Sequence, residues 1–166
     1  MPDESTKHTI PPDPALHRAS EAKIAKKEYD VFLSYNRKDR DEVRAIGEKL
    51  KDYGIAPWFD EWDLRPGLPW KSSLEEDVPH IKSAAIFVGE AGFGRWQRRE
   101  IEVFLDEFVN RGCPVIPVFL PNAPGTELTP FLRSMTWVDF RITDPNPMER
   151  LLWGITGERI SFSSGE

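Results

Sequence analysis

The sequence predicts an α/β protein with a flavodoxin-like, doubly wound sheet of five parallel strands in the order 2-1-3-4-5. Short β-rich segments alternate with segments of helical spacing along most of the chain, a pattern that favours parallel pairing and right-handed crossovers. Two of the β-rich segments, 83–89 and 114–120, are apolar without alternation, as expected of strands covered on both faces. The 166 residues suffice for one domain with one core.

The strands are expected where β-branched and aromatic residues cluster between turn-forming residues. In chain order they are residues 29–35, 55–59, 83–89, 114–120 and 136–140. Pro57 makes the second an edge or irregular strand, because proline cannot donate to a backbone ladder.

Apolar residues at three- and four-residue spacing predict helices between these strands. The helices cover about residues 38–53, 71–79, 94–111 and 147–154. Asn36 and Gly54 supply the start and stop signals of the first of them. Residues 121–135 are expected to form an irregular loop with one helical turn, since prolines and a glycine interrupt them. Trp137 and Trp153 are expected in the core.

Residues 60–70 are expected to form a surface loop, because Pro66, Gly67 and Pro69 interrupt the periods of both helix and strand. The apolar content of this segment is high for a loop, and an exposed apolar patch commonly marks an interface. The residues predicted to form that interface are Trp62, Leu64, Pro66, Gly67 and Leu68.

The ordered domain is expected over residues 28–157. It lies between a flexible N-terminal extension at 1–27 and a flexible tail at 158–166. The extension is polar, charged and proline-bearing, without an apolar period that could fold against a core.

Composition excludes several classes of function. The 22 basic and 28 acidic residues give a net charge of −6, which argues against a nucleic-acid partner. The single cysteine, Cys113, rules out an internal disulfide and a cysteine-based zinc site, and it favours a reducing cytoplasm. The scattered histidines predict no metal site. No membrane association is expected, because no apolar run approaches about 20 residues and no secretory signal begins the chain.

Ligands of doubly wound sheets bind outside the carboxyl ends of the strands, near the point where the strand order reverses. Three segments of this sequence follow the strands at that edge, namely residues 34–39, 60–70 and 89–100. The predicted site is therefore built from these segments.

The motifs in these segments resemble, in order and spacing, those of the Toll/interleukin-1 receptor (TIR) domain family. Residues 29–35 (YDVFLSY), with the charged segment to Asp39, resemble box 1, and residues 64–67 (LRPG) resemble the BB loop. Residues 83–88 (SAAIFV) resemble the third strand, and 131–137 lie where box 3 is expected. Residues 96–100 (WQRRE) resemble the W-x-x-x-E helix start of TIR domains that cleave NAD. The resemblance covers about residues 28–155.

That resemblance implies one of two functions. The first is NAD glycohydrolase activity, which cleaves the nicotinamide–ribose bond to give nicotinamide and ADP-ribose or a cyclic ADP-ribose isomer in immune or anti-phage signalling. The second is a non-catalytic assembly module that acts by homotypic association. The expected partners are NAD, further copies of the domain, and a sensor that is a separate protein or a fused domain. No cofactor is expected, because NAD is the substrate. A nucleotide-handling domain similar to nucleoside deoxyribosyltransferases is a more distant alternative.

Within the resemblance, the family's catalytic glutamate corresponds to Glu100 and its substrate-stacking aromatic residue to Trp96. Gln97 departs from the small or polar residue that is usual after that tryptophan, a change expected to leave activity intact. On a helix, positions 96 and 100 are one turn apart and about 40° apart around the axis. A carboxylate there can stabilise the oxocarbenium charge of the ribose, and nicotinamide leaves without a general acid because it departs from a cation.

The remaining predicted substrate-binding residues are Ser34, Tyr35, Asn36, Asp39 and Arg65. Simpler roles remain open for most of them. Tyr35 and Asn36 can cap the following helix, Asp39 can favour its positive end, and Arg65 can be a solvated loop charge.

Overall fold

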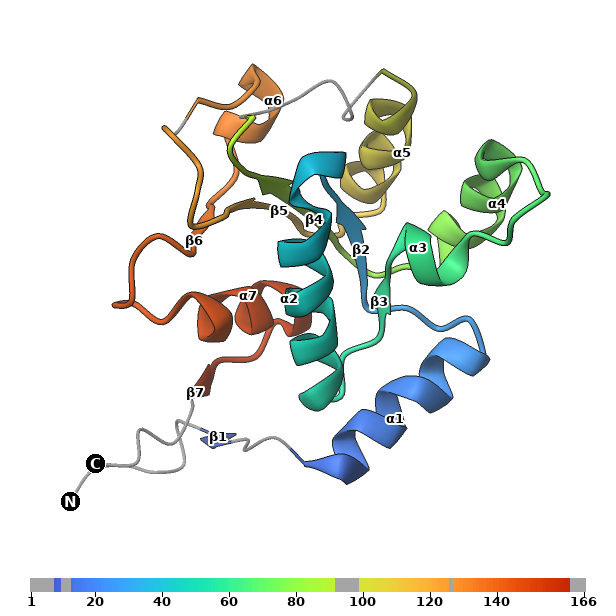
Figure 1. The fold of residues 1–166 in the computed structure, drawn as a ribbon, viewed down its shortest axis with the longest axis horizontal. Helices are drawn as coiled ribbons and strands as arrows, with labels where there is room; N and C mark the ends of the chain where they lie inside the picture. Colours follow the sequence, from blue (N-terminus) through green and yellow to red (C-terminus); the bar gives the residue numbers. More distant parts are fainter. Residues whose placement is uncertain (1–7, 10–12, 92–98, 126, 162–166) are drawn as a thin grey trace.

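The computed structural model describes residues 8–9, 13–91, 99–125 and 127–161, and of residues 8–9 and 99–102 it describes the backbone alone. Its centre is a five-stranded sheet (Figure 1). In spatial order the strands are β3 (Pro57–Trp58), β2 (Val31–Ser34), β4 (Ala84–Val88), β5 (Val115–Phe119) and β6 (Val138–Asp139). Every pairing is parallel, so the predicted order 2-1-3-4-5 is confirmed. The strand that contains Pro57 lies at the edge, as expected.

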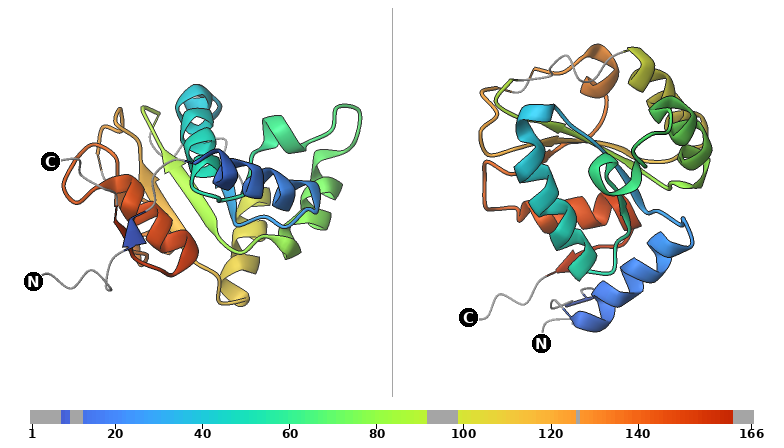
Figure 2. Two further views of the ribbon diagram at one scale, coloured as in Figure 1. Left: turned by 90° about the horizontal axis from the view of Figure 1, so that it is seen from below. Right: turned by 45° about the vertical axis from the view of Figure 1, so that its right-hand side comes forward.

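Helices cover both faces of the sheet (Figure 2). One core cluster joins α4 (Trp70–Asp77) and α5 (Arg99–Asn110) to one face, and a second joins α2 (Arg40–Asp52) and α7 (Pro147–Thr156) to the other. Successive residues of β4 alternate between the two clusters, with Ile86 in the first and Phe87 in the second. Both faces of the strand are thus buried, which explains its continuous apolar sequence.

Shorter helical elements connect the layers. They are η2 (Arg37–Asp39), α3 (Asp60–Asp63), η3 (Val78–His80) and α6 (Pro130–Arg133). Asn36 accepts a hydrogen bond from the amide of Lys38 at 2.9 Å and so caps η2, and Gly54 follows α2 with a φ of +82°. The start and stop signals read from the sequence therefore act where they were expected. Within the described part of the chain, each helix is too short or too polar to cross a membrane.

The prediction of a wholly flexible N-terminal extension is wrong for α1 (Pro14–Ala25), which packs against α2. His17 Nδ1 lies 3.1 Å from Asp52 Oδ1, and Lys23 Nζ donates to Asp30 Oδ2 at 3.0 Å. Ser20 is fully buried at this contact. Ile24 also packs against the core, and Leu16 lies beside Gly54, but these apolar contacts are too few to give the segment an apolar period in the sequence. Before α1, β1 (His8–Thr9) pairs in parallel with β7 (Ile160–Ser161), so these two short strands from early and late in the sequence lie side by side (Figure 1).

Two other predictions need correction. Trp137 and Trp153 are 41% and 37% exposed and therefore lie at the surface of the core instead of within it. Trp137 packs edge-on against Phe119, while Trp153 packs beneath the guanidinium groups of Arg150 and Arg159. A large indole that is held on one side commonly keeps the other side in solvent.

Candidate functional site

A cleft of about 660 Å³ opens at the carboxyl ends of β4 and β5. Val88 and Ala91 form one side, and the loop that follows β5 forms the other. The loop residues that line it are Pro124, Gly125, Glu127, Leu128 and Thr129. This volume falls within the range of about 300–1,000 Å³ that small-molecule sites occupy. The cleft lies at the edge of the sheet where ligands of this architecture bind.

Three strand ends converge beside this cleft. Asp39, which follows β2, is 2% exposed, and its carboxylate packs against Gly89 at the end of β4. A Cβ atom on Gly89 would lie 2.2 Å from Asp39 Oδ1, so only glycine leaves room for this carboxylate. The side chain of Asn122, after β5, and the backbone amide of Glu90 also face it. Of the three segments predicted to form the site, residues 34–39 thus meet the start of 89–100, whose residues 92–98 lie outside the described part of the chain.

Ser34 and Asp39 are buried without hydrogen-bond partners of standard geometry among the described residues. Burial raises the pKa of Asp39 above its ordinary value, and the charge of Glu90 adds to the effect. Asn122, the Glu90 amide and Lys38 act in the opposite direction. Neither Ser34 nor Asp39 is among the described residues that line the cleft.

Tyr35 points into the core. Its ring is 4% exposed and stacks on Phe59 with a centroid separation of 5.2 Å, and its hydroxyl donates to Asp60 Oδ1. In this arrangement the ring is not presented to the cleft, which departs from the prediction that it flanks a substrate base. The contacts instead join the end of β2 to α3. Asn36 serves as the cap of η2, the simpler of its two predicted roles.

The 60–70 segment is only partly a loop, which corrects the prediction. Its first four residues form α3, and its last residue begins α4. Trp62 is half-buried against Phe59, with Lys51 Nζ 4.1 Å from its ring centre, and Leu64 packs against the core.

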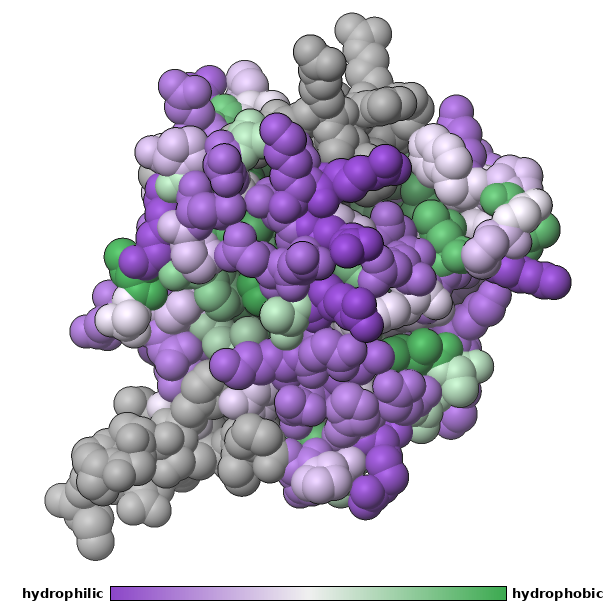
Figure 3. All heavy atoms as spheres, in the orientation of Figure 1, coloured by the Kyte–Doolittle hydropathy of each residue, from purple (hydrophilic) through white to green (hydrophobic). Residues whose placement is uncertain are grey.

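The exposed part of this segment is the turn between the two helices, which we call the α3–α4 connection (residues 64–70). The side chains of Arg65, Pro66, Leu68 and Trp70 are exposed there, as is Gly67. Figure 3 shows hydrophobic side chains over this part of an otherwise largely hydrophilic face. Of the predicted interface residues, Pro66, Gly67 and Leu68 are thus exposed and available for contact with a partner. Trp62 and Leu64 are partly buried and pack against the core clusters.

Asp63, in the same segment, is expected to make the stability of the folded domain depend on pH. It accepts hydrogen bonds from the Phe59 amide and the Tyr29 hydroxyl, and burial raises its pKa to about 6. Between about pH 4 and this value the folded state binds more protons than the unfolded state, so stability falls as pH rises. We expect the free energy of unfolding to drop by about 2 kcal/mol across this range.

Denaturant titrations of the wild type and of Asp63→Asn test this expectation. The amide keeps the size of the side chain without titrating, so the variant should lose most of the decrease, whereas Asp106→Asn on exposed surface of α5 should retain it. An unchanged pH profile in Asp63→Asn would contradict the assignment.

The predicted catalytic residue is Glu100, and the predicted substrate-stacking residue is Trp96. Trp96 is outside the described residues. Glu100 is the second residue of α5, and the structure describes its backbone alone. Its predicted role therefore remains a prediction.

Sequence reasoning missed the loop wall of the cleft. The irregular composition of residues 121–129 and their position after the fourth strand were visible, but no motif distinguished them. Their location at the carboxyl edge, shared with the predicted site, was the signal that could have identified them.

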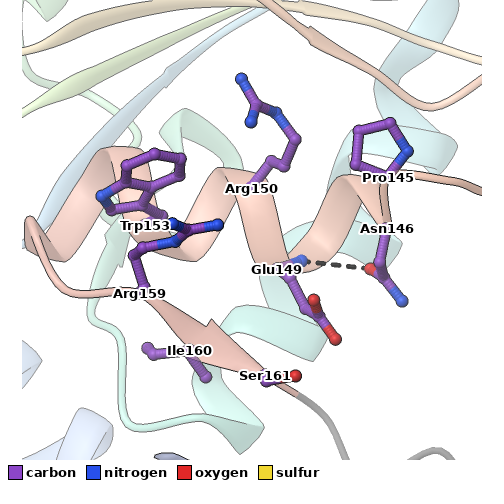
Figure 4. A pocket seen from close by; sticks show the side chains of 8 residues that line it. All are labelled: Pro145, Asn146, Glu149, Arg150, Trp153, Arg159, Ile160 and Ser161. Atoms are coloured by element: carbon purple, nitrogen blue, oxygen red, sulfur yellow. Dashed lines mark hydrogen bonds between the residues drawn. The ribbon is translucent and has the colours of Figure 1, made fainter. Parts of the chain in front are cut away.

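A smaller hollow of about 120 Å³ lies between α7 and β7 (Figure 4). It contains Arg150, Trp153 and Arg159, and the cleft at the strand ends shares none of its lining residues. The two guanidinium groups lie 5.5 and 4.7 Å from the ring centre of Trp153.

The family is decided by comparison with known proteins. The family model described as "TIR domain" matches residues 31–152, which span all five strands of the sheet. The chain belongs to the TIR domain family.

Curated relatives of this TIR domain have low sequence identity to it. The NAD(+) hydrolase TcpA of Theionarchaea archaeon is 27% identical over 94 residues, which are 55% of this chain and 29% of the relative. The 2' cyclic ADP-D-ribose synthase AbTIR of Acinetobacter baumannii is 22% identical over 55% of this chain and 35% of the relative. The probable 2' cyclic ADP-D-ribose synthase TcpB of Brucella abortus is 23% identical over 72% of this chain and 50% of the relative. The TIR domain thus spans at most half the length of these relatives.

Solved structures share the TIR fold. The TIR domain of the Toll-related receptor TRR-2 from Hydra magnipapillata aligns with a TM-score of 0.61 and 22% identity, over 76% of this chain and 98% of that one. A metazoan TIR-STING receptor from C. gigas aligns with a TM-score of 0.63 and 23% identity, over 77% of this chain and 39% of that one. At this identity the likeness establishes the architecture of the TIR domain alone.

Proposed function

We propose that this TIR domain is an NAD glycohydrolase that cleaves the bond between nicotinamide and ribose. The observation that carries the proposal is the position of Glu100 in the first turn of α5, which begins at the same edge of the sheet as the 660 Å³ cleft (Figure 1). A helix that follows a parallel strand starts at the carboxyl edge of that strand, so the fold itself puts the first turn of α5 beside the ligand-binding edge.

The names of the relatives support the same chemistry. One is an NAD(+) hydrolase and two are 2' cyclic ADP-D-ribose synthases or probable ones, and all of these activities break the same glycosidic bond. The segment that matches the TIR family model, residues 31–152, includes Trp96 and Glu100.

In the proposed reaction, the carbon–nitrogen bond at the ribose breaks and its electron pair leaves with nicotinamide. Nicotinamide departs as a neutral molecule, because it is a cation within NAD, and no proton has to be supplied to it. The Glu100 carboxylate stabilises the positive charge that develops on the ribose. Water then adds to the ribose carbon and releases a proton, which gives ADP-ribose, or a hydroxyl group of the same molecule adds and gives a cyclic isomer.

The other predicted residues support substrate binding in this proposal. Trp96 stacks on a base of the substrate. The amides at the start of α5 are suited to an anionic group such as the pyrophosphate. Arg65, on the exposed α3–α4 connection, adds a positively charged side chain to the partial positive charge of the amides at the start of α5. Ser34 and Asp39 are buried, so in this proposal they act indirectly, and Asp39 does so through its contact with Gly89 at the end of β4.

Incubation of concentrated protein with NAD, followed by chromatography of the products, tests the proposal. Nicotinamide and an adenine-containing product should appear together in equal amounts. A folded protein that releases no nicotinamide would favour the alternative of a non-catalytic assembly module.

The exposed apolar residues of the α3–α4 connection suggest that the domain must associate with further copies of itself to be active. Leu68 and Trp70 are 53% and 43% exposed on it, and contiguous exposed apolar side chains commonly mark an interface. We propose that copies of the domain associate through this surface, and that a sensor in a partner or in a fused domain promotes the association during an immune or anti-phage response.

Specific activity should therefore rise with protein concentration over about a hundredfold range, as mass action requires. Leu68→Gln should abolish the rise without unfolding the domain, because the side chain lies largely in solvent. Val109→Gln, at a site of similar exposure on α5, is the matched control and should behave as the wild type. A flat profile for a protein shown by sedimentation to remain monomeric would contradict this requirement.

A further inference from the structure

Arg141, which follows β6, makes an unusually complete set of contacts for a surface arginine. Its Nε and Nη2 atoms donate to the two carboxylate oxygens of Asp139 at 2.9 and 3.0 Å. Its Nη1 atom donates to the backbone carbonyls of Gly125 at 2.9 Å and Ala123 at 3.3 Å. The guanidinium group also lies 4.7 Å from the ring centre of Phe119. A single planar group thus connects β6, β5 and the loop that follows β5.

The Asp139 carboxylate orients this group. The hydrogen bonds from Arg141 lower the pKa of Asp139 below its ordinary value, which keeps the pair ionised. A bidentate pair fixes the plane of the guanidinium, so its remaining N–H groups point in set directions. Those directions are toward the two loop carbonyls.

The carbonyls that Arg141 binds belong to the loop that forms the wall of the cleft: Gly125 lines the cleft itself, and Ala123 directly precedes the lining residue Pro124. Pro124 and Gly125 line the cleft, and the segment has neither helix nor strand to hold it. Irregular loops with few internal hydrogen bonds open more easily than regular elements. The position of this wall therefore depends on a side chain from the neighbouring strand.

We propose that Arg141 is a positioning residue for the NAD substrate. It holds residues 123–125 in place and so shapes the wall opposite Val88 and Ala91, without contact to the bond that breaks. This inference rests on the proposed function. A wall that contacts the bound substrate equally in the ground state and the transition state affects KM and leaves kcat unchanged.

Arg141→Lys tests the proposal, because lysine keeps the positive charge but cannot bind Asp139 and two carbonyls at once. KM for NAD should rise about tenfold, as expected for the loss of charge-assisted hydrogen bonds, while kcat should change less than about twofold. Arg133→Lys is the matched control, since that arginine is exposed on α6 and its side chain makes no hydrogen bond or ion pair to the described residues. An unchanged KM in Arg141→Lys, or a fall in kcat at constant KM, would overturn the proposal.

Hydrogen exchange separates this inference from the activity on which it rests. Amides in the 121–129 segment should exchange faster in Arg141→Lys than in the wild type, whereas those in β4 and β5 should not change. Asp139→Asn should show a smaller increase in the same segment, because it loosens the guanidinium and leaves the carbonyl contacts possible. If the wild type does not cleave NAD, the proposed function fails, and hydrogen exchange alone then tests whether Arg141 holds the 121–129 segment in place. Unchanged exchange in both variants would show that it does not.

Discussion

Replacement of Glu100 with glutamine should lower the rate of nicotinamide release by about a hundredfold or more, the scale of losing one preorganised electrostatic group. Glutamine keeps the size of the side chain and its capacity to accept a hydrogen bond, but it removes the charge that stabilises the ribose cation. The domain should remain folded, because the position lies at the first turn of α5 and the apolar contacts of that helix come from Phe104, Leu105 and Phe108.

The matched control is Asp106→Asn, which removes one negative charge from the exposed side of the same helix. That variant should retain nearly all of the wild-type rate. A well-folded Glu100→Gln protein that released nicotinamide at close to the wild-type rate would show that another group carries the reaction.

The largest expected effect on stability is at Gly89. An alanine there would place its Cβ atom 2.2 Å from Asp39 Oδ1 and 2.3 Å from Asp39 Cγ. Both residues are buried at the junction of β2 and β4, so neither can move away without disturbing the sheet. We expect Gly89→Ala to destabilise the domain by about 3 kcal/mol, in the range of overpacked cores.

A double-mutant cycle identifies the cause of that loss. Asp39→Ala removes the carboxylate and should restore most of the stability to Gly89→Ala, with a coupling of at least about 1 kcal/mol. On its own, Asp39→Ala should cost little at neutral pH, because burial raises the pKa of this carboxyl and makes its ionised form unfavourable. Additive effects of the two substitutions in denaturant unfolding would contradict the proposed clash.

The sequence predicts the sheet well because the residue pattern of each strand depends on how that strand is buried and whether it lies at the edge of the sheet. The continuous apolar runs of β4 and β5 indicate burial on both faces, and Pro57 indicates an edge. The burial of Tyr35 also follows a simple period, since it shares one face with Val31 and Leu33. Its interpretation as a substrate-stacking residue did not take this alternation into account.

The features that the sequence did not predict depend on contacts between distant residues. Docking of α1 relies on pairs such as His17 with Asp52, which are separated by 35 positions. The wall of the cleft is irregular in sequence and is fixed by Arg141 from beyond the next helix. Local propensity and periodicity carry no information about either contact.

The measurement that tests the central claim most directly is the release of nicotinamide from NAD by concentrated, purified protein, with Glu100→Gln measured in parallel at the same concentration. The proposed activity predicts nicotinamide together with ADP-ribose or a cyclic isomer in the wild-type reaction, and a rate that is lower by about a hundredfold or more in the variant. A folded, self-associated wild-type protein that leaves NAD intact would contradict the claim, and it would identify this TIR domain as an assembly module.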